Sequence, residues 1–201
     1  MRDVIEHYNK LIDENNDPFR DPKPLRDYMD KWDGQKFIDS MRLDKNKSVL
    51  EIGIGTGRLA MKVAPNCKSL YGIDVSEKTI QRAAENLSLC RNIKLVCGDF
   101  MAFECEECFD IVYSSLTFMH IQDKLLAIQK VASLLSNNGL FVLSIDKSQN
   151  EFIDMGDRKI KIYPDNPIDI RHFLSISNLK IINEYEIDHA YVMVSQKASF
   201  V

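Results

Sequence analysis

The sequence predicts an α/β fold with a doubly wound, mostly parallel sheet and helices on both faces. Three observations lead to this prediction. From Ser48 onward, short β-rich segments alternate with segments of helical periodicity. The strand candidates are nearly continuous in hydrophobicity, and the chain ends in two adjacent strand-like segments. A chain of 201 residues is also long enough to form one well-buried core.

Five parallel strands are expected along the middle of the chain. They span residues 48–52, 70–73, 93–97, 109–113 and 139–145. Continuous hydrophobicity is typical of strands that are buried on both faces of a sheet. Strand, helix and strand at these intervals indicate βαβ units, whose helices cover the sheet.

Two helices between these strands are predicted from apolar residues that recur at helical spacing. The first carries its apolar stripe over residues 80–87, with Ser76 as its N-cap. The second spans residues 122–136, and Asn137, Asn138 and Gly139 are a typical C-terminal stop.

The last third of the chain predicts a different arrangement. Residues 168–177 have a helical pattern, and residues 179–188 and 190–197 are two strand-like runs. The link between these runs is too short for a parallel crossover. We therefore expect an antiparallel hairpin at the edge of the sheet.

The first 46 residues predict two amphipathic helices joined by the Pro/Asp/Asn-rich loop NNDPFRDPKP. We expect residues 1–46 to pack on the sheet domain, residues 47–201, rather than to form a domain of their own.

Composition narrows the class of protein. The net charge is −4 and the pI is near 5.6, which argues against a nucleic-acid partner, since such binding usually needs a basic face. No apolar run approaches 18 residues, so no membrane span is expected. The start MRDVIEHYNK lacks the apolar segment of a secretory signal, and five cysteines are an odd number. We therefore expect reduced thiols and a cytoplasmic location.

A glycine loop, residues 53–57, follows the first strand in the stretch VLEIGIGTGRLA. It holds Gly53, Gly55 and Gly57, whereas a dinucleotide fingerprint would need a glycine at position 58, which is Arg58 here. Glu51, at the end of the strand, would repel a pyrophosphate but suits a cationic ammonium group. We expect Arg58 to face solvent or to form a salt bridge at the first helix turn.

Two more carboxylates follow the next two strands. Asp74 can accept both hydroxyls of a ribose, a role it would also have toward NAD. Asp99, next to Phe100, suits the exocyclic amine of an adenine whose face the neighbouring ring would cover. Together with Glu51, these acids predict a ligand that joins a nucleoside to an amino acid. The alternative for each acid is a helix cap or a turn residue.

The motifs EIGIGTG, GID, GDF, FDIVYSS and LLSNNGLFVLSID, in this order and spacing, resemble those of class I S-adenosylmethionine-dependent methyltransferases. The resemblance covers residues 36–197 and implies a seven-stranded sheet whose last strand is inserted antiparallel. It implies that the glycine loop passes close to the methionine part of the cofactor, with Glu51 near the ammonium group. It also implies Asp74 on the ribose, and Asp99 with Phe100 at the adenine.

Further cofactor contacts are expected where the strand order reverses between the first and fourth strands, since ligands of doubly wound sheets bind there. Helices that precede the first strand in this family also commonly form a lid over the cofactor. The additional residues are Ile54, Val75, Ser114, Ser115, Leu116, Tyr8 and Trp32. For Tyr8 and Trp32, packing between helices is the alternative.

His120 lies just beyond the fourth strand and is the candidate general base for a proton of an acceptor hydroxyl or amine. The alternative is a histidine that packs at a helix start. In-line methyl transfer needs no covalent catalysis and no metal, so we expect the protein to supply mainly proximity and alignment. The stretch YSSL lacks the Asn/Asp-Pro-Pro-aromatic motif of base or amide methylation, which favours a small-molecule acceptor.

Two other functions stay open at this point. An NAD-dependent oxidoreductase would share the strand, glycine loop and helix at the start of the sheet domain. A non-catalytic module could bind S-adenosylmethionine without transferring its methyl group. Cys105 and Cys108 are a single CxxC pair, only half a zinc site, so no metal is expected. The basic segment 157–164 is interpreted as a solvated edge strand or loop, at the position of an acceptor-binding insertion.

Overall fold

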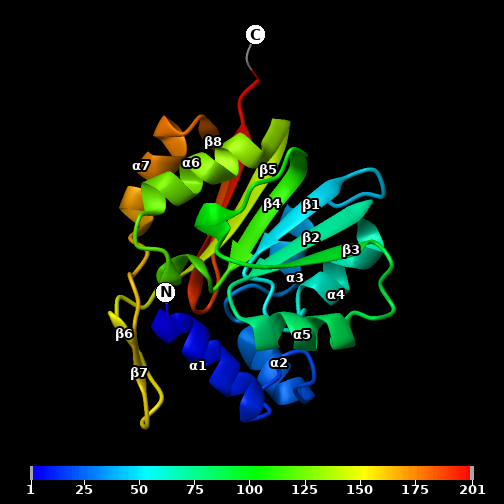
Figure 1. The fold of residues 1–201 in the computed structure, drawn as a ribbon. Helices are drawn as coiled ribbons and strands as arrows, with labels where there is room; N and C mark the ends of the chain where they lie inside the picture. Colours follow the sequence, from blue (N-terminus) through cyan, green and yellow to red (C-terminus); the bar gives the residue numbers. More distant parts are fainter. Residues whose placement is uncertain (1, 200–201) are drawn as a thin grey trace.

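The computed structural model describes residues 2–199 and contains a seven-stranded sheet in the order β3-β2-β1-β4-β5-β9-β8 (Figure 1). The strands are β1 (Ser48–Ile52), β2 (Ser69–Asp74), β3 (Ile93–Cys97), β4 (Phe109–Ser115), β5 (Leu135–Asp146), β8 (Leu179–Glu186) and β9 (Ala190–Lys197). β9 pairs antiparallel with both of its neighbours, and the other neighbouring pairs are parallel. The predicted fold class, including the antiparallel C-terminal hairpin, is therefore confirmed.

Helices cover both faces of this sheet. The helices α3 (Gly34–Ser40), α4 (Ala60–Val63) and α5 (Glu77–Asn86) pack on one face, and α6 (Lys124–Leu134) and α7 (Pro167–Ile176) on the other. Short 3-10 turns lie at Ala64–Asn66 (η1), Phe100–Ala102 (η2) and Phe118–His120 (η3). The predicted N-cap of α5 is present, because the Ser76 Oγ accepts a hydrogen bond from the Thr79 amide at 3.1 Å.

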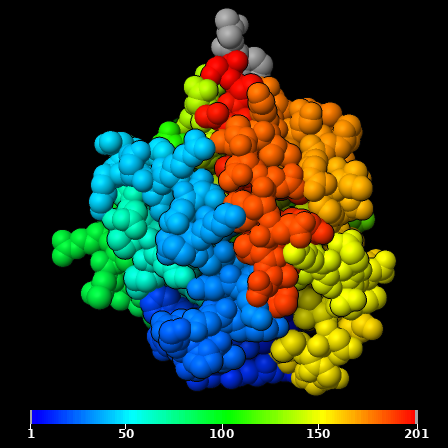
Figure 2. Space-filling model, turned by 180° about the vertical axis from the view of Figure 1, so that it is seen from behind, coloured from blue at the N-terminus to red at the C-terminus, as the bar shows by residue number. Residues whose placement is uncertain are grey.

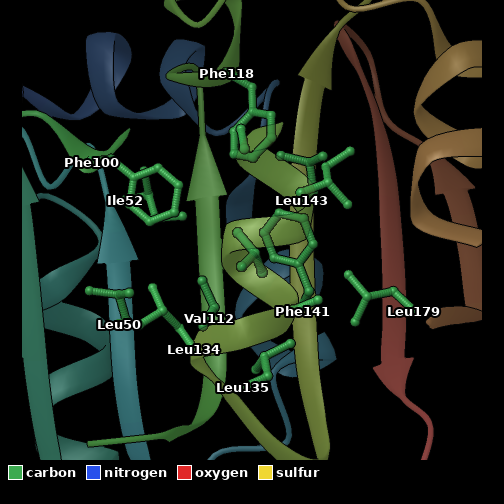
Figure 3. Packing of buried hydrophobic residues seen from close by; sticks show 14 of the residues in the cluster. Leu50, Ile52, Phe100, Val112, Phe118, Leu134, Leu135, Phe141, Leu143 and Leu179 are labelled. Atoms are coloured by element: carbon green, nitrogen blue, oxygen red, sulfur yellow. The ribbon is translucent and has the colours of Figure 1, made fainter. Parts of the chain in front are cut away.

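Successive side chains of each strand point to opposite faces of the sheet, so the buried side chains form two clusters. On β4, Val112 points toward α6 and α7, whereas Ile111 and Tyr113 point toward α3, α4 and α5. Figure 3 shows Phe118 and Phe141 side by side in the first cluster, over β4 and β5. Burial of each such side chain contributes about 1.5–3 kcal/mol. The strand ends that carry the predicted site are thus held between two packed layers.

The connection between α6 and β5 differs from the prediction. α6 ends at Leu134, because Leu135 already pairs with Phe109 as the first residue of β5. The β4–β5 register shifts between Phe109 and Ile111, and Asn138 adopts a φ of +62°. The Asn-Asn-Gly stretch therefore lies within β5, at this register shift, instead of joining the helix to the strand.

The N-terminal segment contains the two expected helices, α1 (Arg2–Asp13) and α2 (Lys23–Met29). The third helix, α3, was not expected, and it begins where the Asp33 side chain accepts a hydrogen bond from the Gly34 amide at 2.7 Å. Phe37 and Met41 are fully buried against the sheet. α3 is therefore part of the core, while α1 and α2 lie beyond the carboxyl ends of the central strands (Figure 1).

A separate hairpin follows β5, made of β6 (Phe152–Asp154) and β7 (Lys159–Lys161). It includes most of the basic segment 157–164 and contacts α1. Figure 2 shows this hairpin (yellow) at the same end of the molecule as the N-terminal helices (blue). Among residues 2–199, no helix is both long and apolar enough to cross a membrane.

Candidate functional site

A cavity of about 230 Å³ lies at the carboxyl ends of β1, β2 and β4, beside α1. It includes the point where the strand order reverses between β1 and β4, as expected for a doubly wound sheet. The predicted site residues that line it are Tyr8, Glu51, Gly53, Ile54, Gly55, Asp74, Val75, Asp99, Phe100, Ser115, Leu116 and His120. Gly57, Ser114 and Trp32 were predicted with them, and they lie outside its lining.

The glycine loop is shaped by positive φ angles. At Gly53, with φ +77°, an added Cβ would lie 1.9 Å from the Thr117 Oγ1, so only glycine allows this approach. At Gly55, with φ +56°, a Cβ would meet nothing within 4 Å. The backbone at Gly55 therefore borders open space in the cavity and can be approached closely by a ligand.

Glu51 is a buried carboxyl group with 3% of its surface exposed. Its Oε2 accepts a hydrogen bond from the Tyr113 hydroxyl at 2.7 Å. Burial raises the pKa of Glu51 to about 8, although the Tyr113 hydrogen bond and the charge of Arg58 lower it. A cationic group placed beside it would favour the charged form, so this position suits an ammonium group.

Asp74 is fixed by two backbone donors. Its Oδ2 accepts from the Gly55 amide at 3.1 Å, and its Oδ1 accepts from the Ser76 amide at 3.0 Å. Burial raises the pKa of Asp74, while these hydrogen bonds oppose the rise. Each carboxylate oxygen has a second lone pair, which leaves acceptor capacity for a diol.

Asp99 and Phe100 lie at the end of β3. The Asp99 Oδ1 caps η2 by accepting from the Met101 amide at 2.9 Å. The Phe100 side chain is 5% exposed and lies between the cavity and the core cluster under α6. These residues therefore form a polar and an aromatic wall at one end of the cavity.

The three residues at the end of β4 have different positions. The Ser114 hydroxyl donates to the Ile52 carbonyl at 2.9 Å, so it joins β4 to β1 instead of facing the cavity. The Ser115 hydroxyl donates to Asp33 at 2.9 Å. Leu116 has a φ of +56°, a strained conformation for a branched side chain, of the kind that clusters at functional sites.

Gly57 and Trp32 also have roles outside the cavity. An added Cβ at Gly57 would lie 2.7 Å from the Leu87 side chain, so Gly57 allows α5 to pack against the loop. The Trp32 indole donates to Asp146 at 2.9 Å and packs against the His189 ring, tilted by 48° at a centroid distance of 4.6 Å. Trp32 thus contacts the last residue of β5 and the residue before β9.

His120 and Tyr8 meet on the side of the cavity that α1 covers. The His120 Nε2 lies 2.8 Å from the Tyr8 hydroxyl, and the two rings are edge-to-face. The His120 Nδ1 is buried and has no hydrogen-bond partner among the described residues. Burial first, then the charges of His7 and Lys124, lower the pKa of His120 to about 4, so the imidazole is neutral at pH 7.

Arg58 was expected to face solvent or to form a salt bridge at the first helix turn. It does not face solvent. Its side chain is 12% exposed and lines the cavity. It forms a bidentate ion pair with Asp33 and a second ion pair with Asp30 at 3.2 Å. The Asp33 side chain is fully buried. Asp33 was missed because its sequence position signals only a helix cap; its partner lies 25 residues away.

The cysteines add nothing to this cavity. All five are free, with Cys105 half-buried and Cys108 exposed. Within residues 2–199, no group of three or more His, Cys, Asp or Glu side chains is placed to hold a metal ion.

Comparisons with known proteins give a consistent result. Residues 43–179 match the family described as methyltransferase domain. An uncharacterised methyltransferase of Anoxybacillus flavithermus is 35% identical over 121 residues, which are 58% of this chain and 56% of that protein. The chain thus spans about half the length of the curated relatives that it matches.

Two solved structures show the same fold. The N-methyltransferase NodS from Bradyrhizobium japonicum WM9, in complex with S-adenosyl-L-homocysteine, has a TM-score of 0.71 at 19% identity over 96% of this chain and 98% of NodS. An S-adenosylmethionine-dependent methyltransferase from Clostridium acetobutylicum has a TM-score of 0.70 at 16% identity over 98% and 99% of the two chains.

Proposed function

Because the chain belongs to the methyltransferase domain family, we propose that it transfers a methyl group from S-adenosylmethionine, the cofactor of this class, to a small-molecule acceptor. The observation that carries the proposal is the arrangement of Glu51, Asp74 and Asp99. These three carboxyl groups end three successive strands around the open backbone of Gly55. The alternative of an NAD-dependent oxidoreductase is set aside, because residues 43–179 match a methyltransferase family.

The cavity residues fit this cofactor part by part. Glu51 would hold the ammonium group, Asp74 the ribose hydroxyls, and Asp99 with Phe100 the adenine. The cofactor supplies a methyl group on a sulfonium, which is already an activated leaving group. The residues therefore need to bind, align and exclude water, and α1 supports this by covering the cavity with Val4 and Tyr8.

The rest of the cavity favours a small acceptor without a phosphate group. Apolar side chains of Val4, Pro18, Met29 and Ile121 line it. Arg58 is the one lysine or arginine among the described lining residues, and it is already paired with acids. A phosphate would find no free cation there, which also disfavours a nucleic-acid acceptor.

His120 fits the role of proton acceptor in this reaction. It is neutral at pH 7, so a ring nitrogen is free to accept a proton. A hydroxyl becomes strongly acidic as its oxygen gains a methyl group, so a weakly basic imidazole is sufficient to take the proton of a hydroxyl acceptor.

The lid and the location are part of the same proposal. Of residues 1–46, α1 and α2 would form the lid, since α3 packs in the core. The five free cysteines favour a reducing compartment, in agreement with a cytoplasmic location.

The test is transfer of a labelled methyl group from S-adenosylmethionine into a metabolite extract, compared with RNA and with a protein lysate. We expect label in the small-molecule fraction for the wild type and none for Asp74→Asn. Label only in macromolecules would contradict the proposed acceptor class. Binding of the cofactor without transfer in any fraction would instead favour the non-catalytic module.

A further inference from the structure

We infer that Tyr8 is a positioning residue for His120, and that Arg158 of the β6–β7 hairpin holds the helix that carries Tyr8. This inference rests on the proposed function for its use in the reaction, but the contacts that carry it involve only this chain. Tyr8 lies on α1, His120 ends η3, and Arg158 lies directly before β7. Arg158 contacts α1 at His7 and Glu14, and α1 in turn contacts His120 through Tyr8.

The first step concerns the orientation of the imidazole. A catalytic histidine is usually held by a hydrogen bond to its second nitrogen. In His120 the Nδ1 is buried without a partner among the described residues, and the Nε2 contacts the Tyr8 hydroxyl at 2.8 Å. Tyr8 is therefore the residue whose hydrogen bond fixes the orientation of the ring.

Charged and titratable side chains surround Tyr8 and His120. From α1, His7 lies beside Tyr8; from α6, Lys124 forms an ion pair with Asp165 at 2.7 Å. Burial and the charges of Asp74 keep the Tyr8 hydroxyl protonated by raising its pKa. His120 is thus surrounded by groups that favour its neutral form for as long as α1 stays in place.

The third step is the attachment of α1 to the hairpin. The Arg158 Nε donates to the His7 Nδ1 at 3.0 Å, and its two terminal nitrogens donate to both oxygens of Glu14 at 2.8 and 2.7 Å. The Arg158 side chain is only 16% exposed. These contacts lie on both sides of Tyr8 in the sequence, so Arg158 fixes both the rotation and the position of the helix.

The opposite side of α1 is attached to the cofactor side of the cavity. The Ser76 hydroxyl donates to the Asn9 side chain at 2.9 Å, and Lys78 contacts Asp13 at 2.6 Å. Because these contacts are separate from those of Arg158, removal of the Arg158 contacts should loosen the Tyr8–His120 pair without unfolding the protein.

The test is a pH titration of the four histidine side chains by long-range ¹H–¹⁵N NMR on the ligand-free 201-residue chain. In the wild type we expect His120 to show one neutral tautomer and to titrate near pH 4. In Tyr8→Phe we expect a mixture of tautomers. In Arg158→Gln, and in Glu14→Gln as a second variant, we expect the pKa of His120 to rise by about one unit or more toward 6.5 as water reaches the ring.

The matched control is Arg171→Gln. Arg171 forms an equivalent fork with Glu184, at 2.6 Å, between α7 and β8 and away from the cavity. We expect it to leave the His120 titration unchanged. A His120 titration that is the same in wild type, Tyr8→Phe and Arg158→Gln would overturn the inference. Failure of the wild type to bind S-adenosylmethionine would refute the proposed function but would leave this result standing.

Discussion

Glu51 is deeply buried, and its carboxyl group accepts a hydrogen bond from the Tyr113 hydroxyl. Burial of its charge would lower the stability of the protein without ligand. Its pKa of about 8 means that the carboxyl group is mostly protonated at pH 7. A cationic ligand would bring it to the charged form, and the buried site would then strengthen the ion pair. In the proposed function, Glu51 would thus serve binding at the expense of stability.

Glu51→Gln tests this role directly. Glutamine has nearly the same shape and keeps an oxygen for the Tyr113 hydroxyl, but it cannot become charged. We expect affinity for S-adenosylhomocysteine to fall about 10- to 100-fold, as for loss of a charged hydrogen bond of about 1.5–3 kcal/mol. Unchanged affinity by calorimetry would place the ammonium group elsewhere.

The two glycines at the start of the loop allow a matched comparison. Gly53→Ala should destabilise the protein by about 2–4 kcal/mol, since strain at positive φ is added to a clash with Thr117. Gly55→Ala should cost only about 1–2 kcal/mol, because the new methyl group meets open space. It should nevertheless weaken S-adenosylhomocysteine binding at least tenfold. Thermal melts and calorimetry on both variants provide the measurement, and equal effects of the two variants on both quantities would contradict this account.

At the scale of the elements, the N-terminal segment divides into the core helix α3 and the more exposed helices α1 and α2. α3 buries Phe37 completely, while α2 leaves Leu25 49% exposed. The amphipathic pattern of α1 and α2 is visible in the sequence. The short α3 was not predicted because its burial depends on a sheet that forms later in the chain.

Phe37→Ala should lower the free energy of unfolding by about 3–5 kcal/mol, as expected for a large side chain removed from a packed core. Leu25→Ala, the control on α2, should change it by less than about 0.5 kcal/mol. Denaturant unfolding measures both. A small effect of Phe37→Ala would show that α3 contributes little to the stability of the core.

The strands were predictable because each carries its signal locally. β1 and β3 have the predicted bounds, since their apolar residues end at glycine or polar residues. The contacts that complete the site are not local. Arg58 and Asp33 are 25 residues apart, and Tyr8 and His120 are 112 apart. Pairing of such residues depends on where two separate elements pack, so the sequence indicates the residue types but not the pairs.

At the scale of the whole molecule, Glu51 and His120 make opposite contributions to the pH dependence of stability. The folded-state pKa of Glu51 is raised, so its contribution to stability decreases as pH rises from about 4.5 to about 8. The folded-state pKa of His120 is lowered, so its contribution decreases as pH falls from about 6.5 to about 4. Between about pH 4.5 and 6.5 the two slopes oppose one another.

Glu51→Gln should therefore change the pH profile as well as the affinity. Between about pH 6.5 and 8 the ligand-free wild type should lose roughly 1 kcal/mol of stability per pH unit, and the variant should not. Below about pH 6.5 the variant should show the uncompensated loss caused by His120. Urea unfolding at a series of pH values measures both slopes, and parallel profiles of the two proteins would contradict the assignment to Glu51.

The central claim is that three carboxyl groups and a glycine loop bind S-adenosylmethionine. Calorimetric titration of the wild type with S-adenosylhomocysteine at pH 7, in two buffers of different protonation enthalpy, tests it most directly. We expect saturable binding at one site with release of about one proton, because Glu51 must lose its proton to pair with the ammonium group. We expect no heat of binding with NAD. Absence of saturable heat with S-adenosylhomocysteine and S-adenosylmethionine, or equal binding of NAD, would contradict it.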